Sequence, residues 1–416
     1  MIYSKHRRFL QWLFISLFII IIVSGCAKKE LLIEKYPPGL YHIPKRLTDI
    51  SFENNPKFIF YGDSRPGWRI QEKFLNRKNW ATWKMAIIPF YQIYWLGSGA
   101  VGGINRLRNT PDYGTRERLM VRDTIYEEAK RSNIDFILHG GDMPTNGQRP
   151  SHWAQFVQEN KIDLPMMSEF PTLPVIGNHE RANDPKYGFP NYKAVFDYPQ
   201  FYVLDFPDAA IFVLDSNVVI DQYGFIDNDE QDGWFQKWFV SNVAEEPAWL
   251  ERELESRSQP FKIVVMHHSP LSFAKHHTDW YEPRWGNNLK EKRHQFLSML
   301  NKQGVQVLLC GHDHLYEHNT IHFPGSAKPE MHIIISGGGG VPLRPISEPD
   351  KLEKYHADYV AEGLDVTLIK QKSIFNYCLV DVASDRVTIR VMEILRNSNG
   401  MPKLVEEIVI GDIVNP

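Results

Sequence analysis

Short apolar runs recur along the chain between polar segments, and their length predicts buried strands. Residues 305–310 (VQVLLC) are β-branched and leucine-rich and end at Gly311, which is typical of a strand followed by a sharp turn. Similar apolar runs lie at 57–61, 134–138, 172–176, 262–266 and 331–335. Residues 201–206 and 210–214 alternate like a hairpin, and two late strands are expected at 375–381 and 386–394.

Helical spacing fills several of the intervals between these runs. Apolar residues recur with helical spacing in 115–131 and 289–300, and residues 245–257 also look helical. Strands that alternate with helices predict an α/β domain. At 416 residues, the chain could hold one large domain or two smaller ones.

Metal-competent or acid–base side chains follow five of the predicted strands. In chain order they are Asp63, Asp142, Asn178 with His179, His267 with His268, and His312 with His314. Open α/β sheets place ligands at the carboxyl ends of parallel strands, and neutral imidazole is the commonest transition-metal ligand. One such block alone could be a surface loop that contains histidines. Five blocks in this order predict a metal centre.

These blocks resemble a known family. The sequences GD (62–63), GDMPTNG (141–147), GNHE (177–180), MHHSP (266–270) and GHDH (311–314) are similar to the motifs of the calcineurin-like metallophosphoesterases, on the side that includes the purple acid phosphatases. The glycine-rich SGGGG at 336–340 adds to the likeness, which covers roughly residues 56–345. It implies a four-layer α/β/β/α sandwich of two mixed β-sheets flanked by helices.

The resemblance also implies two metal ions. Asp142 would bridge them, and Asp63 and His314 would hold the first ion. The ligands implied for the second ion are Asn178, His312 and one of His267 and His268, between which the sequence does not choose. Mixed Asp, Asn and His ligands suit Mn, Fe or Zn. Two such ions about 3.5–4 Å apart can bridge a hydroxide and clamp the phosphoryl oxygens.

Two further positions carry implied or proposed catalytic roles. The resemblance makes His179 the catalytic histidine, as acid for the leaving group or as a charge stabiliser. His277, or its neighbour His276, resembles a further histidine on the substrate side.

Arg65 departs from the family pattern. Most of the superfamily has a metal-binding histidine there, and purple acid phosphatases instead supply a tyrosine at the position of Thr145. A guanidinium stays protonated and cannot coordinate a cation. Either water completes a weak first site, or only the second site is firmly occupied. We expect Arg65 to grip a substrate phosphate bidentately, or to pair with a nearby carboxylate.

The N-terminus is predicted to be a targeting segment. Residues 5–8 are basic, 9–23 are apolar, and the segment ends at Cys26, which resembles a bacterial lipobox. Residues 1–26 would then be a lipoprotein signal peptide, and Cys26 would anchor an exported protein at the periplasmic face or the cell surface. The alternative is an uncleaved signal anchor.

The remaining boundaries follow from composition. A linker is expected at 27–55, the metallophosphoesterase domain at 56–395, an aromatic-rich insertion at 66–114, and a C-terminal tail at 396–416. The insertion is either an amphipathic lid that touches a bilayer or an apolar substrate, or a segment that packs its aromatics on the domain.

Charge and cysteine content narrow the function. A net charge of −3 argues against a general nucleic-acid surface, and Cys310 and Cys378 are expected to be buried thiols, although a bridge between them is not excluded. We predict a lipid-anchored, metal-dependent hydrolase of phosphoric esters that uses a metal-bound hydroxide. The alternatives are a catalytically degenerate binding protein and a phosphatase of membrane lipid or envelope phosphates. Oligomeric state and substrate identity stay open.

Overall fold

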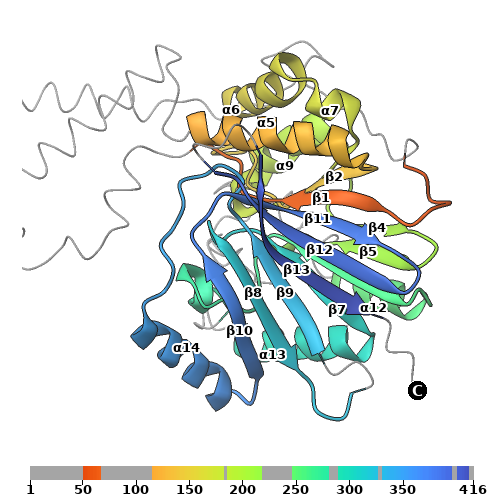
Figure 1. Cartoon of the computed structure of the whole chain (residues 1–416), viewed down its shortest axis with the longest axis vertical. Coiled ribbons are helices and arrows are strands. Elements are labelled where there is room, and N and C mark those ends of the chain that lie inside the picture. Colours follow the sequence, from red (N-terminus) through yellow and green to blue (C-terminus); the bar gives the residue numbers. More distant parts are fainter. Residues whose placement is uncertain are drawn as a thin grey trace, which may run out of the picture.

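Two mixed β-sheets form the centre of the molecule. The computed structural model describes residues 50–66, 115–181, 185–217, 246–280, 289–326, 330–395 and 401–411. The first sheet has the order β13-β12-β11-β1-β2-β3, and the second has the order β10-β8-β9-β7-β6-β5-β4 (Figure 1). In the first sheet β1, β2 and β3 run parallel, and in the second β5, β6, β7 and β9 run parallel.

The strands of the first sheet are β1 (Lys57–Tyr61), β2 (Phe136–His139), β3 (Thr172–Pro174), β11 (Asn376–Val382), β12 (Arg386–Glu393) and β13 (Lys403–Gly411). Those of the second are β4 (Tyr202–Asp205), β5 (Ala209–Val213), β6 (Phe261–Met266), β7 (Val305–Cys310), β8 (Tyr316–His322), β9 (Glu330–Ser336) and β10 (Asp365–Lys372).

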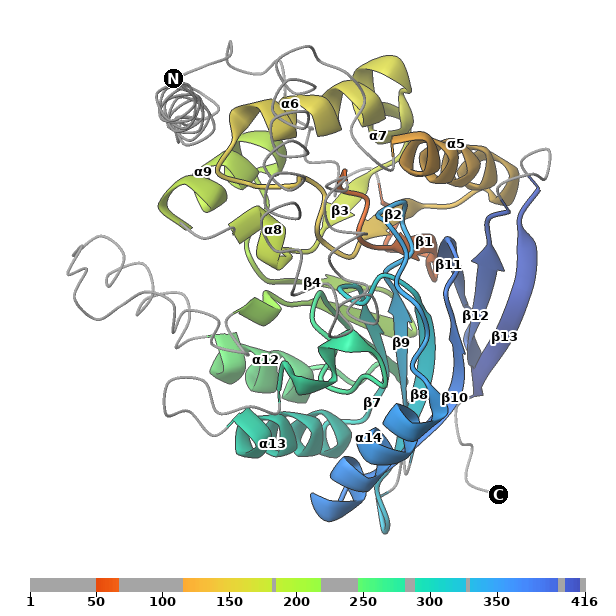
Figure 2. The same ribbon diagram turned by 90° about the vertical axis from the view of Figure 1, so that its left-hand side faces the viewer.

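Helices cover the outer face of each sheet (Figure 2). On the first sheet lie α5 (Thr115–Ser132), α6 (Pro150–Val157) with the π-helix η4 (Gln158–Asp163), α7 (Met166–Glu169), α8 (Asn178–Arg181) and α9 (Pro185–Phe196). On the second lie α12 (Glu246–Glu255), α13 (Leu289–Lys302) and α14 (Pro349–Ala361), with a short 3-10 helix, η6 (Lys275–Thr278), near the strand ends. The predicted sandwich of two mixed sheets with flanking helices is confirmed.

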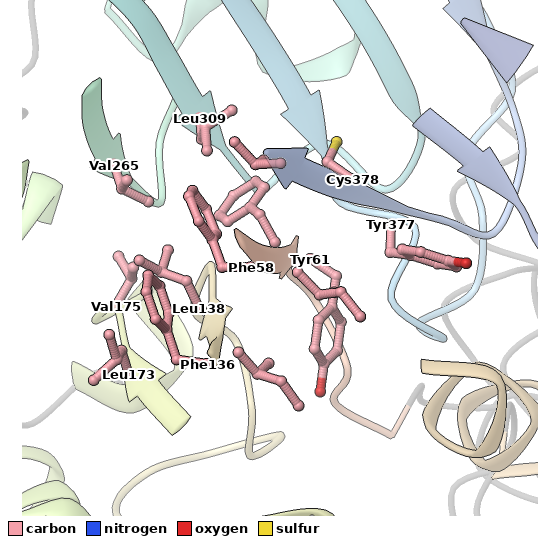
Figure 3. Close-up of a cluster of buried hydrophobic side chains, with 14 of the residues drawn as sticks. Phe58, Tyr61, Phe136, Leu138, Leu173, Val175, Val265, Leu309, Tyr377 and Cys378 are labelled. Carbon is pink, nitrogen blue, oxygen red and sulfur yellow. The ribbon is translucent and has the colours of Figure 1, made fainter. Parts of the chain in front are cut away.

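The core between the sheets explains why the strand runs are apolar on both faces. Phe58 of β1 stacks on Phe136 of β2 with ring centroids 4.9 Å apart, while Val265 and Leu309 of the second sheet belong to the same buried cluster (Figure 3). A second cluster fills the space between the second sheet and α12, α13 and α14. Burial on both faces therefore replaces the alternating pattern of a half-exposed strand.

Most predicted elements are found within a few residues of their expected bounds. The hairpin of β4 and β5 is antiparallel as expected, and Cys310 and Cys378 are buried and free, so no bridge joins them. The strands β8, β10 and β13 and the helices α7, α8, α9 and α14 were not predicted. β13 pairs with β12, so the first sheet continues into residues 396–416, where we expected a tail.

The predicted signal peptide at 1–26, the linker up to residue 49 and the insertion from residue 67 lie outside the described residues. Within the described part of the chain, no helix is both long enough and apolar enough to cross a membrane.

Candidate metal centre

Backbone hydrogen bonds join the loops that follow the parallel strands of both sheets. Gly140 N–H donates to Tyr61 O (2.7 Å), Asp63 N–H to Gly141 O (2.9 Å) and Gly311 N–H to His267 O (3.0 Å). The backbone N–H of His312 donates to Asp63 Oδ2 at 2.8 Å, across the gap between the sheets. The predicted strand-end side chains are thereby brought to one place.

Three of these side chains sit on strained backbone. Asp63, Asp142 and His312 have φ values of 63°, 60° and 70°. Non-glycine residues rarely adopt this left-handed region, and such residues cluster at functional sites where the surroundings hold them in place. Asn133 and Asp197 also have positive φ, but the three residues above are the ones that lie together at the strand ends after β1, β2 and β7, which favours a functional role there.

Two glycines make the close approach of these loops feasible. A Cβ atom on Gly177 would lie 2.5 Å from Asp142 Oδ1, and one on Gly311 would lie 2.8 Å from Asp63 Oδ2. Real Cβ atoms do not tolerate such distances from oxygen, so only glycine fits at either position.

His267 and His312 present nitrogen lone pairs to each other. His267 Nδ1 lies 2.7 Å from Gly140 O, and His312 Nε2 lies 2.9 Å from Asp279 Oδ2. Because both of these oxygens only accept, the neutral rings carry their protons there. His267 Nε2 and His312 Nδ1 are 3.2 Å apart and are left without a proton between them.

That arrangement suits a cation. One ligand atom each from His267, His268 and His312 lies within 4.8 Å of the others, and all three rings are buried. Burial lowers the pKa of each imidazole, so the rings are neutral and available as ligands. Asn178 Oδ1 is buried without a hydrogen-bond partner, and Asp142 Oδ1 lies 3.3 Å from His267 Nε2. We call these five residues the imidazole half of the centre, and its donors fit a transition-metal ion.

The sequence did not choose between His267 and His268 as the ligand, and both lie in this half. His267 contacts Asp142 and His312, and His268 packs its ring 4.3 Å from that of His312, with Nδ1 2.8 Å from Ser216 Oγ.

Asp279 was missed by the sequence analysis. Its Oδ2 atom accepts from His276 Nδ1 at 2.8 Å and from His312 Nε2 at 2.9 Å. Burial opposes ionisation of Asp279, but His276 and His312 hold the pKa of this carboxyl well below its usual range. A carboxylate behind an imidazole fixes its orientation, so Asp279 aims His312 Nδ1 at the centre. Asp279 follows η6 and not a strand, so no strand-end pattern could identify it.

Asp63, His314, Arg65 and Asp142 Oδ2 form the other side, which we call the arginine half. Arg65 is 3% exposed, and its Nε donates to Asp142 Oδ2 at 3.2 Å. Asp63 Oδ1 is buried without a hydrogen-bond partner, 3.6 Å from His314 Nε2. Burial and the neighbouring Asp142 raise the pKa of Asp63.

Of the two roles weighed for Arg65, the structure contains the carboxylate pairing. Thr145, at the position where purple acid phosphatases supply a tyrosine, donates its hydroxyl to Pro66 O at 3.0 Å and offers no replacement ligand. One ligand atom each from Asp63, Asp142 and His267 also lies within 4.8 Å of the others, so donors are present near the arginine half. They fit a metal ion less well than those of the imidazole half, because the permanent cation of Arg65 already pairs with Asp142.

His179 lies at the edge of the centre. Its backbone N–H donates to Asp142 Oδ1 at 3.0 Å, its Nδ1 lies 2.6 Å from Thr145 O, and its Nε2 lies 3.7 Å from Asp142 Oδ2. The side chain is 22% exposed, so one side faces outward. Burial and the charge of Arg65 lower the pKa of His179 to about 4.

Glu180 holds the loops behind the centre, a role the sequence analysis did not assign. Its carboxylate accepts the backbone N–H groups of Asp142 (2.9 Å), Met143 (2.6 Å) and Gly177 (2.8 Å). Burial, with Asp142 nearby, raises its pKa to about 8. The glutamate of GNHE is thus a positioning residue for the loops after β2 and β3.

His277 is not where we expected it. Its Nδ1 lies 2.9 Å from Ser272 O, its Nε2 lies 3.4 Å from Asp358 Oδ2, and its ring stacks on Tyr355 of α14. In the 3-10 helix, neighbouring residues point to different sides, and His276 takes the inner position with its ring 3.7 Å from that of His312. Of the two histidines that the resemblance offered, His276 and not His277 faces the centre, so the substrate-side role stays a prediction for His276.

Comparisons with known proteins agree with this geometry. Residues 113–316 match the model of the family described as calcineurin-like phosphoesterase. The chain is 24% identical to "Probable inactive purple acid phosphatase 27" of Arabidopsis thaliana, over 53% of this chain and 37% of that protein. It is also 24% identical to purple acid phosphatase 17 of the same plant, over 59% of this chain and 73% of that protein.

A solved structure shares the fold. A purple acid phosphatase from yellow lupin seeds superposes with a TM-score of 0.53 at 16% identity, covering 86% of this chain and 54% of that one. The chain thus spans only about a third to three quarters of the length of these relatives.

Proposed function

We propose that the protein is a metal-dependent hydrolase of phosphoric esters, because residues 113–316 match the calcineurin-like phosphoesterase family and the chain is similar to purple acid phosphatases. The observation that carries the proposal is the imidazole half, where ligand atoms of three buried imidazoles cluster within 4.8 Å and Asp142 Oδ1 lies 3.3 Å from His267 Nε2. Buried polar groups are normally paired, whereas here the facing nitrogens of His267 and His312 share no proton and Asn178 Oδ1 has no partner.

Asn178, Asp142 Oδ1 and the three imidazoles would hold an ion in that half. When bound, a metal ion supplies the nucleophile, because it lowers the pKa of water enough for hydroxide to form near neutral pH. The sequence also predicts a second ion, for which Asp63, His314 and Asp142 Oδ2 are the donors present. The mixed Asp, Asn and His donors suit Mn, Fe or Zn, and we propose that the metal is one of these three.

The residues around the centre favour an anionic substrate. Arg65 and Arg344 place two guanidinium groups near Asp63, and partial burial together with Arg344 lowers the pKa of Lys275 to about 8. These cations would attract and orient phosphoryl oxygens and stabilise the charge that grows on them during attack. Arg65 Nη1 is buried without a partner and so has a donor to spare for such an oxygen.

His179 would act on the leaving group. Its Nδ1 proton is committed to Thr145 O, so its Nε2 is the atom free to deliver a proton or to hold charge. With a pKa of about 4, the free ring is neutral at pH 7, and a bound phosphate would favour its protonation.

The test is metal analysis combined with a panel of phosphate esters. Purified protein with Mn²⁺ should cleave p-nitrophenyl phosphate or its bis-ester, and His312→Ala should lose both metal and activity. Protein that binds metal but cleaves no ester in the panel would favour the alternative of a ligand-binding protein, which the Arg65–Asp142 pair also supports.

We further propose that the protein is exported and anchored through a lipidated Cys26, as the pattern of residues 1–26 indicates. Replacing Cys26 with Ser should move the protein from the membrane fraction to the soluble fraction. A Cys26→Ser protein that stays in the membrane would instead indicate an uncleaved signal anchor.

A further inference from the structure

Arg65 occupies the arginine half as a buried permanent cation. Its side chain is 4% exposed, and its Nε pairs with Asp142 Oδ2, the carboxylate oxygen that faces away from His267. Its charge also acts on Asp63 and His314, and on His267 of the imidazole half. The ion pair, however, is with Asp142 Oδ2, so the guanidinium already occupies the side of Asp142 that an ion in the arginine half would need.

A divalent ion at these donors would meet strong repulsion. The guanidinium cannot lose its proton, so titration offers no relief, and like charges interact strongly where water is excluded. Making room would also require Arg65 to give up Asp142 and would leave a buried charge without its partner, which is costly.

None of the five residues of the imidazole half is an arginine or a lysine. The facing nitrogens of His267 and His312 lie 3.2 Å apart, and Asn178 Oδ1 is buried without a hydrogen-bond partner. Asp142 Oδ1 is turned to this side and contacts His267 Nε2. An ion between His267 and His312 would take up the two ring lone pairs that now share no proton.

We propose that the centre binds one metal ion, in the imidazole half, and that the Arg65 guanidinium supplies the second positive charge. Asp142 then bridges a metal ion and an arginine, where two ions would otherwise share it. This rests on the metal binding in the proposed function but not on hydrolysis.

Metal stoichiometry tests the proposal without reference to activity. The full chain, solubilised and stripped with chelator, is reloaded with Mn²⁺, desalted and measured by elemental analysis and by electron paramagnetic resonance. We expect one Mn²⁺ per chain with the six-line spectrum of an isolated ion. Two ions per chain, or a spin-coupled pair, would overturn the proposal.

Variants assign the result to named residues. Arg65→His should raise the content to two ions per chain, because it removes the charge and adds a ligand. Arg118→His is the matched control, since Arg118 is also a buried arginine but pairs with Glu159 and belongs to neither half of the centre, and it should stay at one ion. If Arg65→His does not fold, Arg65→Met removes the charge alone, and Mn²⁺ titration should then show a second, weaker site. An Arg65 variant that folds and still binds only one ion refutes the role given to Arg65.

Two histidines from one loop provide a second check. His312→Ala should lose the ion, whereas His314→Ala should keep it, because His314 belongs to the arginine half. Loss of the ion in both variants would contradict a single site in the imidazole half. Protein that binds one ion yet cleaves no ester leaves this inference standing while the proposed hydrolysis fails.

Discussion

At the scale of single residues, His179 is expected to take part in catalysis without holding the metal ion. It contacts Asp142 but is not one of the three imidazoles whose ligand atoms cluster. His179→Asn should therefore lower kcat by about 10²- to 10⁴-fold, the usual contribution of a positioned acid or base, with metal content unchanged. Steady-state kinetics and elemental analysis on the same sample measure both. His277→Asn is the control, and an equal fall in kcat for it would remove the special role of His179.

Glu180 acts one step further back, through the backbone. Glu180→Ala leaves the N–H groups of Asp142, Met143 and Gly177 without their acceptor in the interior. Each buried unpaired group costs about 1–3 kcal/mol, so the free energy of unfolding should fall by about 3 kcal/mol or more. Urea denaturation measures the change. Glu127→Ala removes only the exposed pair with Lys130 and should cost less than about 1 kcal/mol.

The contrast between predicted and missed residues has a physical cause. Asp142 and His312 were identifiable from the sequence because each closely follows an apolar strand. The carboxyl ends of parallel strands lie at the same edge of a sheet, so residues that follow them come close together. Asp279 and Glu180 act through hydrogen bonds to groups that are distant in sequence, and nothing local marks such a partner. The side to which His276 and His277 point depends on the local backbone of η6, which a sequence pattern does not fix.

At the scale of elements, Glu406 of β13 links this strand to the second sheet by hydrogen bonds. Its carboxylate accepts from Tyr316 (2.8 Å) and His318 (3.0 Å) of β8, and Lys370 of β10 lies 3.2 Å away. Partial burial raises the pKa of Glu406, but the hydrogen bonds from His318, Tyr316 and Lys370 outweigh it and lower the pKa from 4.5 to about 2. The ionised carboxylate therefore joins the last strand of one sheet to the other sheet.

This coupling predicts a defined pH dependence. Between pH 4.5 and about 2 the folded protein binds fewer protons at Glu406 than the unfolded chain, so stability falls as the pH falls through this window. Glu406→Gln should lose about 2 kcal/mol at pH 7, and the difference from wild type should shrink toward pH 2. Urea denaturation of both proteins over a pH series checks this.

Glu407 provides the matched control for Glu406. It is the next residue of β13, points to the other face and pairs with Arg390 where both side chains are about 40% exposed. Glu407→Gln should change stability by less than about 1 kcal/mol at every pH. Equal pH profiles for the two variants would contradict the role of Glu406.

Strand pattern predicted the buried centre of each sheet better than its edges. β7 was predicted to the residue because VQVLLC is apolar throughout. β8 (YEHNTIH) reads as polar, yet all but its last residue are buried, because its polar side chains pair with residues such as Glu406 and His332. β10 and β13 lie at sheet edges, where exposed positions dilute the apolar alternation.

At the scale of the whole molecule, the proposed ion would join the two sheets. Asp142 and Asn178 follow β2 and β3 of the first sheet, whereas His267 and His312 follow β6 and β7 of the second. The layered architecture could be expected because these strand-end motifs resemble a family with that fold. The sequence offered a carboxylate partner as one of two roles for Arg65 but did not identify Asp142, which follows the neighbouring strand of the same sheet. The contact of β13 with β8 could not be expected, because it depends on how the two sheets face each other.

A ligand that binds only the folded state stabilises it by mass action. Free metal at about 100 times its dissociation constant should add about 2.7 kcal/mol, so the Tm should rise with the logarithm of metal concentration and fall on chelation. His312→Ala should abolish the shift, because it removes a donor of the second sheet. His318→Ala is the control. It removes a histidine that contacts His332 in the same sheet but outside the centre, so the Tm shift should remain. If the Tm of His312→Ala still rises with metal, the ion binds outside the centre. The added stability would then not come from an ion that joins the two sheets.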